Sequence, residues 1–192
     1  FGQYSLGELY AKGKGVPQNY KDATKWYRLA AHQGDTKSQS ILGEMYDFGR
    51  GVKQDYQEAI EWYRLAVKQN DASAQSSLGL MYQYGHGVKQ NYDEALRLFH
   101  LSAEQKDSYG QSNLGHMYRK GIGVEQNHKE AIKWYRLSAE QKNPTGQYNL
   151  GEMYAMGQGV EKDYQVAIKL YTFAAEQRNS EAQKALGDLY AS

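Results

Sequence analysis

A five-residue motif recurs along this chain with a constant spacing of 36 residues. Its clearest copy is Leu42-Gly43-Glu44-Met45-Tyr46, in which a tyrosine follows the leucine–glycine pair. The same pattern begins at five further leucines: Leu6, Leu78, Leu114, Leu150 and Leu186. A fixed period of roughly 20 to 50 residues is typical of stacked-repeat proteins, in which each unit contacts only its neighbours. The spacing therefore predicts a single elongated domain across all 192 residues.

Each repeat has the pattern of two helices. In the second repeat, Leu42, Met45 and Tyr46 recur at helical spacing and lie on one face of a first helix of about 13 residues. Gly49-Arg50-Gly51-Val52 follows this helix, and a glycine just after a helix end suits the left-handed backbone conformation that closes it. Asp55 then begins a second helix as its N-cap. No alternating strand pattern occurs, so the sequence predicts an all-α fold of antiparallel helix pairs.

The repeats follow one another without a linker. They span residues 1–34, 35–70, 71–106, 107–142 and 143–178, and a sixth first helix covers residues 179–192. The chain begins at Phe1 and ends at Ser192, both inside a repeat, so we expect it to be a piece of a longer protein.

Two features of the first helix point to the neighbouring helices. The glycine of the leucine–glycine pair lies in a helix interior, where it costs about 0.8–1.0 kcal/mol relative to alanine. Its presence in all six copies predicts that a neighbouring backbone or ring packs closely against it. A glutamine also occupies one position in every copy, and we expect it to form hydrogen bonds across repeats: Gln3, Gln39, Gln75, Gln111, Gln147 and Gln183.

The composition argues against several classes of function. The chain carries 23 basic and 22 acidic residues, a formal charge of +1, so no net field favours nucleic acid or an anionic membrane. No apolar run approaches the roughly 18–20 residues that a membrane span requires. The chain has no cysteine, which excludes disulfides and thiolate metal sites and leaves a periplasmic, secreted or cytoplasmic location equally open.

Basic and aromatic residues do alternate in segments such as Lys25-Trp26-Tyr27-Arg28, a composition that base-stacking platforms share. The tyrosine of this segment lies on the apolar face of the second helix, however. We therefore interpret the segment as buried aromatic side chains beside a solvated arginine. The sequence predicts no nucleic-acid partner and no direct insertion into a membrane.

No arrangement of reactive residues predicts an enzyme. The five histidines occupy different positions within their repeats, and none belongs to an HExxH motif. No Gly-x-Ser-x-Gly nucleophile elbow occurs. The Gly-x-Gly turns lack the Lys-Ser/Thr that follows in a phosphate-binding loop, so we interpret them as helix ends. We predict no catalytic residue, no metal site and no cofactor.

Residues 38–67 carry the complete pattern of a known repeat. They combine a small residue at Ser38 with Leu42-Gly43, Tyr46, Gly49-x-Gly51-Val52, Asp55, Ala59, Trp62-Tyr63 and Ala66. Over its whole length the chain resembles the Sel-one-like repeat (SLR) family, which is related to the tetratricopeptide repeats. The resemblance implies an all-α, right-handed superhelical α-solenoid with a 36-residue period, acting as an adaptor that holds other proteins together.

The chain departs from the family pattern at a few positions. Leu98-Phe99 and Leu170-Tyr171 replace the Trp-Tyr pair, and His128 replaces the aromatic residue that opens the second helix. Some bacterial members of the family are cysteine-rich, carry a disulfide in each repeat and are ascribed activity against β-lactams. This chain has no cysteine and therefore lacks the disulfide of that subgroup.

By resemblance to tetratricopeptide arrays, the first helices line a concave groove. The positions of these helices that the fold does not require differ from repeat to repeat. Such variation is expected of a specific binding surface, and it is also expected of a solvated face without a function. Phe48, Tyr84 and Met156 are apolar groups that a solvated face does not need, which favours binding of a protein or peptide segment. The predicted groove residues are Tyr4, Glu8, Glu44, Asp47, Phe48, Leu80, Gln83, Tyr84, His116, Arg119, Lys120, Tyr148, Glu152 and Met156.

Three of these groove residues are basic and lie close together in the sequence. We expect His116, Arg119 and Lys120 to form a local basic spot, which could take an acidic side chain or a C-terminal carboxylate.

The main hypothesis is therefore a non-enzymatic scaffold, and two alternatives remain open. The first is a hydrolase acting on β-lactam or cell-wall amide bonds, as ascribed to some cysteine-rich relatives; it needs a reactive group that the sequence does not show. The second is a purely structural array that self-associates end to end, because the helix at residues 179–192 has an apolar face and no second helix to cover it.

Overall fold

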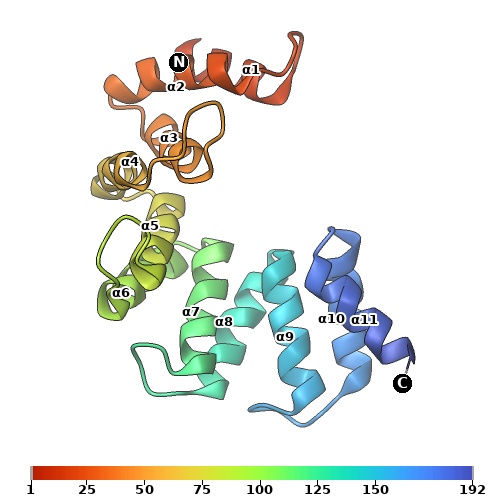
Figure 1. The fold of residues 1–192 in the computed structure, drawn as a ribbon. Coiled ribbons are helices and arrows are strands. Elements are labelled where there is room, and N and C mark those ends of the chain that lie inside the picture. Colours follow the sequence, from red (N-terminus) through yellow and green to blue (C-terminus); the bar gives the residue numbers. More distant parts are fainter. Residues whose placement is uncertain (1, 192) are drawn as a thin grey trace. The chain divides into compact units, whose positions relative to one another are not determined.

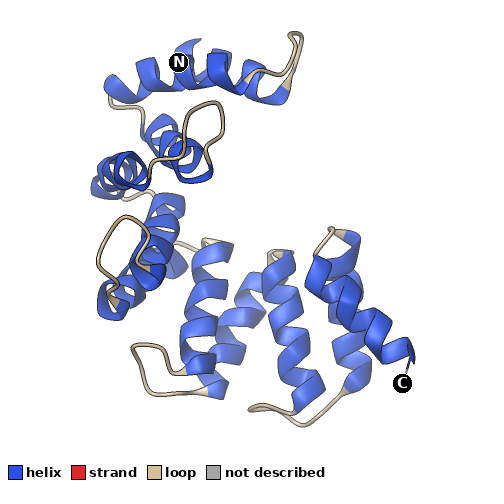
Figure 2. Ribbon diagram, in the orientation of Figure 1, coloured by secondary structure: helices blue, strands red, loops and turns tan. Residues whose placement is uncertain are grey.

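The computed structural model describes residues 2–191, so Ser192 and Phe1 lie outside the described part of the chain. Within that part the chain forms eleven helices and no strand (Figures 1 and 2). The first helices of the repeats are α1 (Gly2–Lys12), α3 (Thr36–Phe48), α5 (Ala72–Tyr84), α7 (Ser108–Lys120), α9 (Pro144–Met156) and α11 (Ser180–Ala191). The second helices are α2 (Tyr20–His32), α4 (Tyr56–Lys68), α6 (Tyr92–Glu104), α8 (His128–Glu140) and α10 (Tyr164–Glu176).

The helix ends follow the predicted capping chemistry. The Asp35 side chain accepts a hydrogen bond from the backbone N–H of Ser38 at 2.7 Å and begins α3. Gly49 ends α3 with a φ of 67°, a left-handed conformation that favours glycine. Asp55 accepts from the backbone N–H groups of Gln57 and Glu58 and begins α4. The predicted all-α solenoid of helix pairs is confirmed, and α3 has the predicted length of 13 residues.

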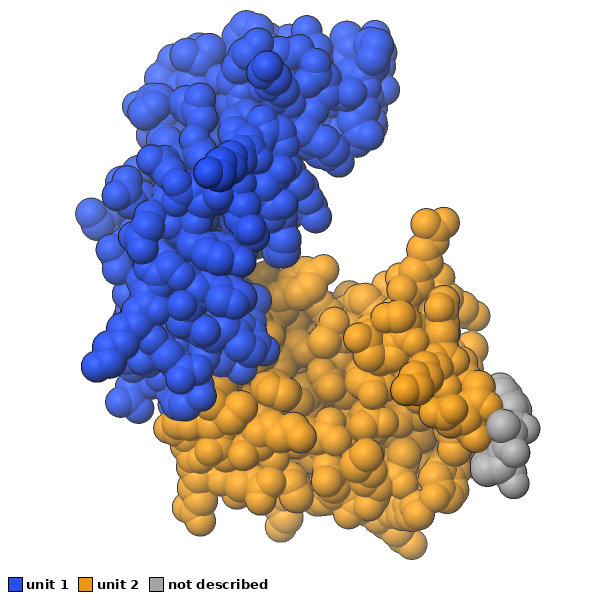
Figure 3. Space-filling model, in the orientation of Figure 1, with its two compact units in different colours: residues 1–98 blue, residues 99–192 orange. Residues whose placement is uncertain are grey.

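The chain divides into two compact units, residues 1–98 and residues 99–192, and the division falls within α6 (Figure 3). Unit 1 stacks its helices in chain order, and α1 packs on α2, α2 on α3, α3 on α4 and α4 on α5. Unit 2 repeats this order, since α7 packs on α8, α8 on α9, α9 on α10 and α10 on α11. The single continuous domain that the repeat predicts stays a prediction.

Each unit has its own apolar core between the paired helices. In unit 1, Ile60 and Tyr63 of α4 pack with Leu78 and Met81 of α5. In unit 2, a cluster on α8 and α9 plays the same part: Ala131, Ile132, Tyr135, Leu150 and Met153. None of the helices in residues 2–191 combines the length and the hydropathy that a membrane span requires.

The interior glycines lie where tyrosine rings pack, as predicted. Tyr27 and Tyr63 of the second helices face Gly7 and Gly43 in unit 1. In unit 2 the same contact joins two further pairs, Gly115 with Tyr135 and Gly151 with Tyr171. A ring, rather than a helix backbone, therefore explains the glycine at these four leucine–glycine pairs.

The recurring glutamines connect consecutive repeats, which confirms the second prediction for the first helix. Gln39 Nε2 donates to the carbonyl of Ala31 in the preceding repeat at 3.1 Å, and Gln39 Oε1 accepts from Gln69 Nε2 at 2.8 Å. In unit 2, Gln111 repeats the arrangement with Ala103 and Gln141. Because one side chain must both donate and accept, an amide is required at this position.

Candidate functional site

The first helices of consecutive repeats lie side by side within each unit. In unit 1, α3 contacts α5, and in unit 2, α7 contacts α9. The predicted groove residues all lie on first helices, and we refer to this set of residues as the helix A face. Its unit 1 part comprises Tyr4, Glu8, Glu44, Asp47, Phe48, Leu80, Gln83 and Tyr84, and its unit 2 part comprises His116, Arg119, Lys120, Tyr148, Glu152 and Met156.

Large apolar side chains are open to solvent on this face. Phe48 is 60% exposed and Tyr84 is 57% exposed in unit 1, and Met156 is 54% exposed in unit 2. All three occupy the same position of the repeat, at the last residue of a first helix. The burial of such groups against a partner would be favourable, because apolar surface removed from water stabilises a complex.

Phe48 does not lie alone on the unit 1 face. The guanidinium carbon of Arg50 lies 5.1 Å from the centroid of the Phe48 ring, within the range of a cation–π contact. Arg50 also donates to Glu44 Oε1 at 2.7 Å. Arg50 therefore joins an acidic and an aromatic side chain of the predicted groove, although it lies in the turn after α3.

Tyr84 belongs to a short aromatic stack. The His86 ring lies between two tyrosines, with its centroid 5.8 Å from that of Tyr84 and 5.0 Å from that of Tyr56. Leu80 lies half-buried on the same helix as Tyr84, whereas Gln83 is only 4% exposed. Gln83 was predicted to line an open groove, and this expectation is wrong because its side chain is packed inside the unit.

The acidic groups of unit 1 differ in their surroundings. Burial raises the pKa of Asp47, and the nearby His86 opposes this shift. Glu8 Oε1 accepts a hydrogen bond from Lys12 Nζ at 2.6 Å, and this bond lowers the pKa of Glu8. Tyr4 has its ring centroid 5.9 Å from that of Tyr27. Tyr4 and Glu8 thus lie together at the α1 end of the face.

Arg119 organises the unit 2 part of the face. Its Nη2 lies 3.6 Å from Glu152 Oε2, and its Nε donates to Gln158 Oε1 at 3.1 Å. The Arg119 side chain is 11% exposed and that of Glu152 is 18% exposed, so this ion pair is largely shielded from water. Arg119 Nη2 also lies 3.6 Å from the Met156 sulfur. The pair therefore joins α7 to α9, and its arginine contacts the exposed side chain of Met156.

Tyrosines complete this network. Tyr171 donates to Glu152 Oε1 at 2.8 Å, and its ring centroid lies 5.7 Å from that of Tyr148. Burial raises the pKa of Tyr171, and the hydrogen bond to the Glu152 carboxylate raises it further. The phenol therefore remains a donor to Glu152 across the neutral range.

The predicted basic spot is only partly present. Arg119 is compensated by Glu152, and burial lowers the pKa of His116, with further lowering by Lys120 and Arg119. Lys120 is exposed at the end of α7. The expectation of three cooperating cations is therefore corrected to one exposed ammonium beside a compensated arginine.

Sequence reasoning missed three residues of this face. Arg50, His86 and Gln158 occupy the middle position of the Gly-x-Gly turns, which we interpreted as turn chemistry alone. The sequence contains a signal that could have found them. The middle residue of the turn varies between repeats, as the groove residues do, while both glycines stay constant. Within residues 2–191, no three histidine, aspartate or glutamate side chains are grouped so that they could hold a metal ion.

Comparisons with known proteins identify the repeat that forms these helices. A family model described as Sel1 repeat matches residues 1–35, 36–71, 72–107, 108–143 and 144–179. Proteins built from this repeat generally act as protein-interaction scaffolds. Comparison with the curated proteins found no match.

Solved structures of bacterial proteins show the same repeat fold. A Sel1 repeat protein from Oxalobacter formigenes is 36% identical with a TM-score of 0.87, and the match covers 99% of this chain and 78% of that one. A protective antigen of uropathogenic Escherichia coli strains, which displays an SLR fold, is 42% identical with a TM-score of 0.78, and the match covers 97% of this chain and 40% of that one. Cysteine-rich protein B of Helicobacter pylori shares the fold at 24% identity and a TM-score of 0.54, over 70% of this chain and 97% of that one. This chain belongs to the Sel1 repeat family.

Proposed function

We propose that the chain is a protein–protein interaction scaffold that binds a peptide or protein segment on its helix A face. One observation carries the proposal, namely the exposure of Phe48, Tyr84 and Met156 at the same position of three repeats. More than half of each of these side chains lies in water, and its burial against a partner would be favourable.

The surroundings of the unit 1 aromatics support the same proposal. Phe48 is flanked by Arg50, and Tyr84 stacks with His86. Aromatic and arginine side chains are the types that most often dominate the energy of an interface. Because Arg50 is already held by Glu44 and His86 is already held between Tyr56 and Tyr84, a partner would meet a preorganised surface.

The unit 2 part of the face supports the proposal through its rigidity. Arg119, Glu152 and Tyr171 hold one another in a shielded network, and Met156 contacts Arg119 of this network. A flexible thioether beside a fixed polar platform can adapt to different apolar side chains. The proposal gives no residue of the chain a catalytic role.

The test is the double variant Phe48→Ala/Tyr84→Ala, used as bait beside the wild-type chain in affinity capture from the native host. We expect the variant to lose the captured partner while its helicity and melting temperature stay near the wild-type values, because both side chains lie in water. A titration of the identified partner into each bait then measures the affinity difference.

The matched control is Leu29→Ala/Leu65→Ala. Both leucines lie in unit 1 and are 48% and 40% exposed, but they belong to the second helices α2 and α4. This control should capture the partner as the wild type does. Equal capture by the Phe48/Tyr84 variant would rule out the helix A face of unit 1 as the binding surface.

A further inference from the structure

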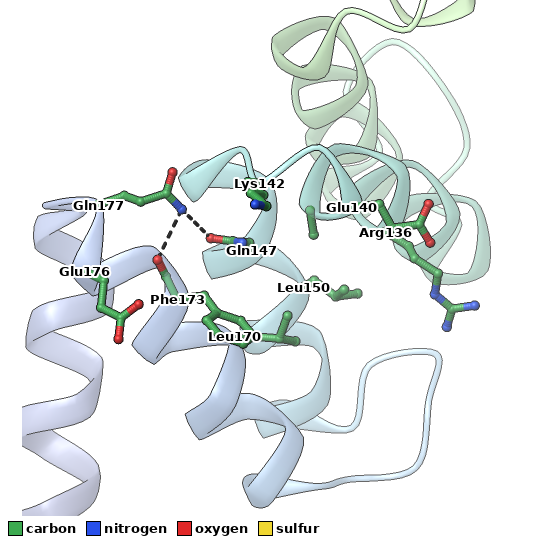
Figure 4. Close-up of a pocket in the computed structure, with 10 residues that line it drawn as sticks. Arg136, Glu140, Lys142, Gln147, Leu150, Leu170, Phe173, Glu176 and Gln177 are labelled. Carbon is green, nitrogen blue, oxygen red and sulfur yellow. Dashed lines mark hydrogen bonds between the residues drawn. The ribbon is translucent and has the colours of Figure 1, made fainter.

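A pocket of about 550 Å³ lies in unit 2 between α8, α10 and the first turns of α9 (Figure 4). Ala139, Leu150, Leu170 and Phe173 give it an apolar lining, and charged side chains such as Arg136 stand at its rim. The volume falls within the roughly 300–1,000 Å³ that is usual for ligand pockets. The pocket uses Gln147 and Leu150 of α9, whereas the helix A face uses Tyr148, Glu152 and Met156, which lie on the other side of that helix.

Comparison of the repeats explains why the pocket exists. The position of Leu170 is occupied by Trp134 in the preceding repeat, by Trp62 three repeats earlier and by Trp26 four repeats earlier. Trp62 is 8% exposed and packs in one cluster with Ala31 and Leu42. A tryptophan therefore fills the corresponding space in unit 1, opposite a small residue of the preceding second helix.

The repeat that has Leu98 instead of tryptophan compensates for the smaller side chain. There the residue opposite is Val67, which packs against the cluster that contains Leu98, and Leu98 is fully buried. At the pocket, by contrast, leucine at 170 replaces the tryptophan, and the residue opposite is Ala139 instead of a valine. Neither side chain is large enough to fill the space. Leu150, at the floor of the pocket, is 5% exposed, whereas its counterparts Leu42 and Leu114 are fully buried.

We propose that this pocket binds the indole side chain of a tryptophan that a partner protein presents. The chain itself supplies the precedent, because three other repeats carry a tryptophan at this position, and Trp62 and Trp134 each follow a second helix as Leu170 does. Their rings contact polar rings of the preceding second helix edge-on, His32 at 5.2 Å from Trp62 and His100 at 6.2 Å from Trp134.

At the pocket the position of His100 is taken by Arg136, which stands at the rim. A guanidinium group attracts the face of an indole ring, and tryptophan gives the strongest such contact among the aromatic side chains. The lining thus offers apolar contact to the ring, and the rim offers a cation to its face. Ligand pockets are usually lined by apolar and aromatic side chains with a few polar groups that fix orientation, and this pocket has that composition.

The probe is N-acetyl-L-tryptophanamide, which carries the indole on an uncharged backbone like that of a peptide. It is titrated into the full chain labelled at the leucine methyl groups, and the NMR signals of Leu150 and Leu170 are followed. We expect saturable shifts of both, with a dissociation constant on the order of a millimolar for so small a ligand. N-acetyl-L-leucinamide should bind at least tenfold more weakly; no saturable shift with the tryptophan probe, or equal shifts with both probes, would overturn the proposal.

Free L-tryptophan distinguishes a protein-borne side chain from a free metabolite. Its ammonium and carboxylate groups must stay solvated, so we expect it to bind more weakly than the amide probe. Tighter binding of the free amino acid would overturn the assignment to a partner protein. This result is independent of the helix A face, because the Phe48 and Tyr84 variant leaves the pocket unchanged.

Two variants that copy other repeats close the pocket. Leu170→Trp introduces the residue of Trp62 and Trp134, and Ala139→Val introduces that of Val67. Each should raise the melting temperature by a few degrees and abolish the shift of Leu150 with the probe. If either folded variant, judged by its circular dichroism, keeps the wild-type affinity for the probe, the site lies elsewhere and the proposal fails.

Discussion

The ring of Tyr135 packs so closely on Gly115 that a Cβ atom added to the glycine would lie 2.7 Å from Cδ1 of the tyrosine. Tyr135 is fully buried, so its ring has no room to move away. The same contact joins Gly151 to Tyr171, with 2.7 Å to Cε1. At Gly187 of α11, by contrast, no heavy atom lies within 4 Å of the added Cβ. The same position of the repeat is therefore tightly packed at Gly115 and Gly151 but open at Gly187.

This difference predicts opposite effects of the same substitution. Gly115→Ala should destabilise the protein by about 1 kcal/mol net, because overpacking costs about 1–3 kcal/mol and the gain in helix propensity offsets only part of it. Gly187→Ala should stabilise α11 by up to about 1 kcal/mol, since it meets no neighbour. Urea unfolding of both variants checks the prediction, and a loss of the same size at Gly187 would contradict it.

The shielded ion pair of unit 2 should matter more than the exposed one of unit 1. Glu152→Ala leaves the Arg119 guanidinium and the Tyr171 hydroxyl without their carboxylate partner, and we expect a loss of about 2 kcal/mol. Glu44→Ala removes the partner of Arg50, but both side chains of that pair are about half exposed. Such pairs contribute about 0–1 kcal/mol. Chemical unfolding of the two variants gives the comparison, and equal losses would refute the assigned difference.

His116 makes stability depend on pH. Burial lowers its pKa in the folded protein, so the unfolded chain binds a proton more readily. The stability that neutral His116 contributes to the folded protein is therefore fully present above the unfolded pKa of about 6.5. It is lost as the pH falls through the pKa of His116 in the folded protein. His116→Gln should remove this part of the pH dependence from melting curves recorded between pH 7.5 and pH 5. An NMR titration that gives His116 a pKa at or above 6.5 in the folded chain would contradict the assignment.

The bridging glutamines should stabilise the stack only where both of their bonds exist. Gln111 is 3% exposed, donates to Ala103 and accepts from Gln141, so Gln111→Ala should cost about 1–3 kcal/mol through unsatisfied buried groups. Gln183 of α11 donates to Ala175 at 3.2 Å but is exposed, so water replaces the lost bond in Gln183→Ala. We expect a change within about 0.5 kcal/mol there. Thermal melts compare the pair, and similar losses at both positions would count against the role of the buried amide.

Much of the fold could be predicted because its signals are local. The cap at Asp35, the left-handed Gly49 and the cap at Asp55 each act within a few residues of their own position. The interior glycine and the recurring glutamine also predicted close packing and bonds between neighbours, since a residue that is costly or constant in a helix requires an external reason. The helix pairs, their boundaries and the family follow from these repeating signals.

The details of the surface depended on contacts between repeats, which no local pattern specifies. The sequence predicted that Arg119 belongs to a local basic spot, but α7 and α9 pack so that Glu152 compensates its charge. It marked Gln83 as open, but packing buries it, and it assigned Arg50 to a turn, although the turn brings its guanidinium to Phe48. The pocket beside Leu170 likewise depends on which residue of the preceding helix lies opposite. The sequence alone determined the repeat and its helices because backbone conformation is decided locally, whereas charge, burial and open space arise only when side chains from different repeats meet.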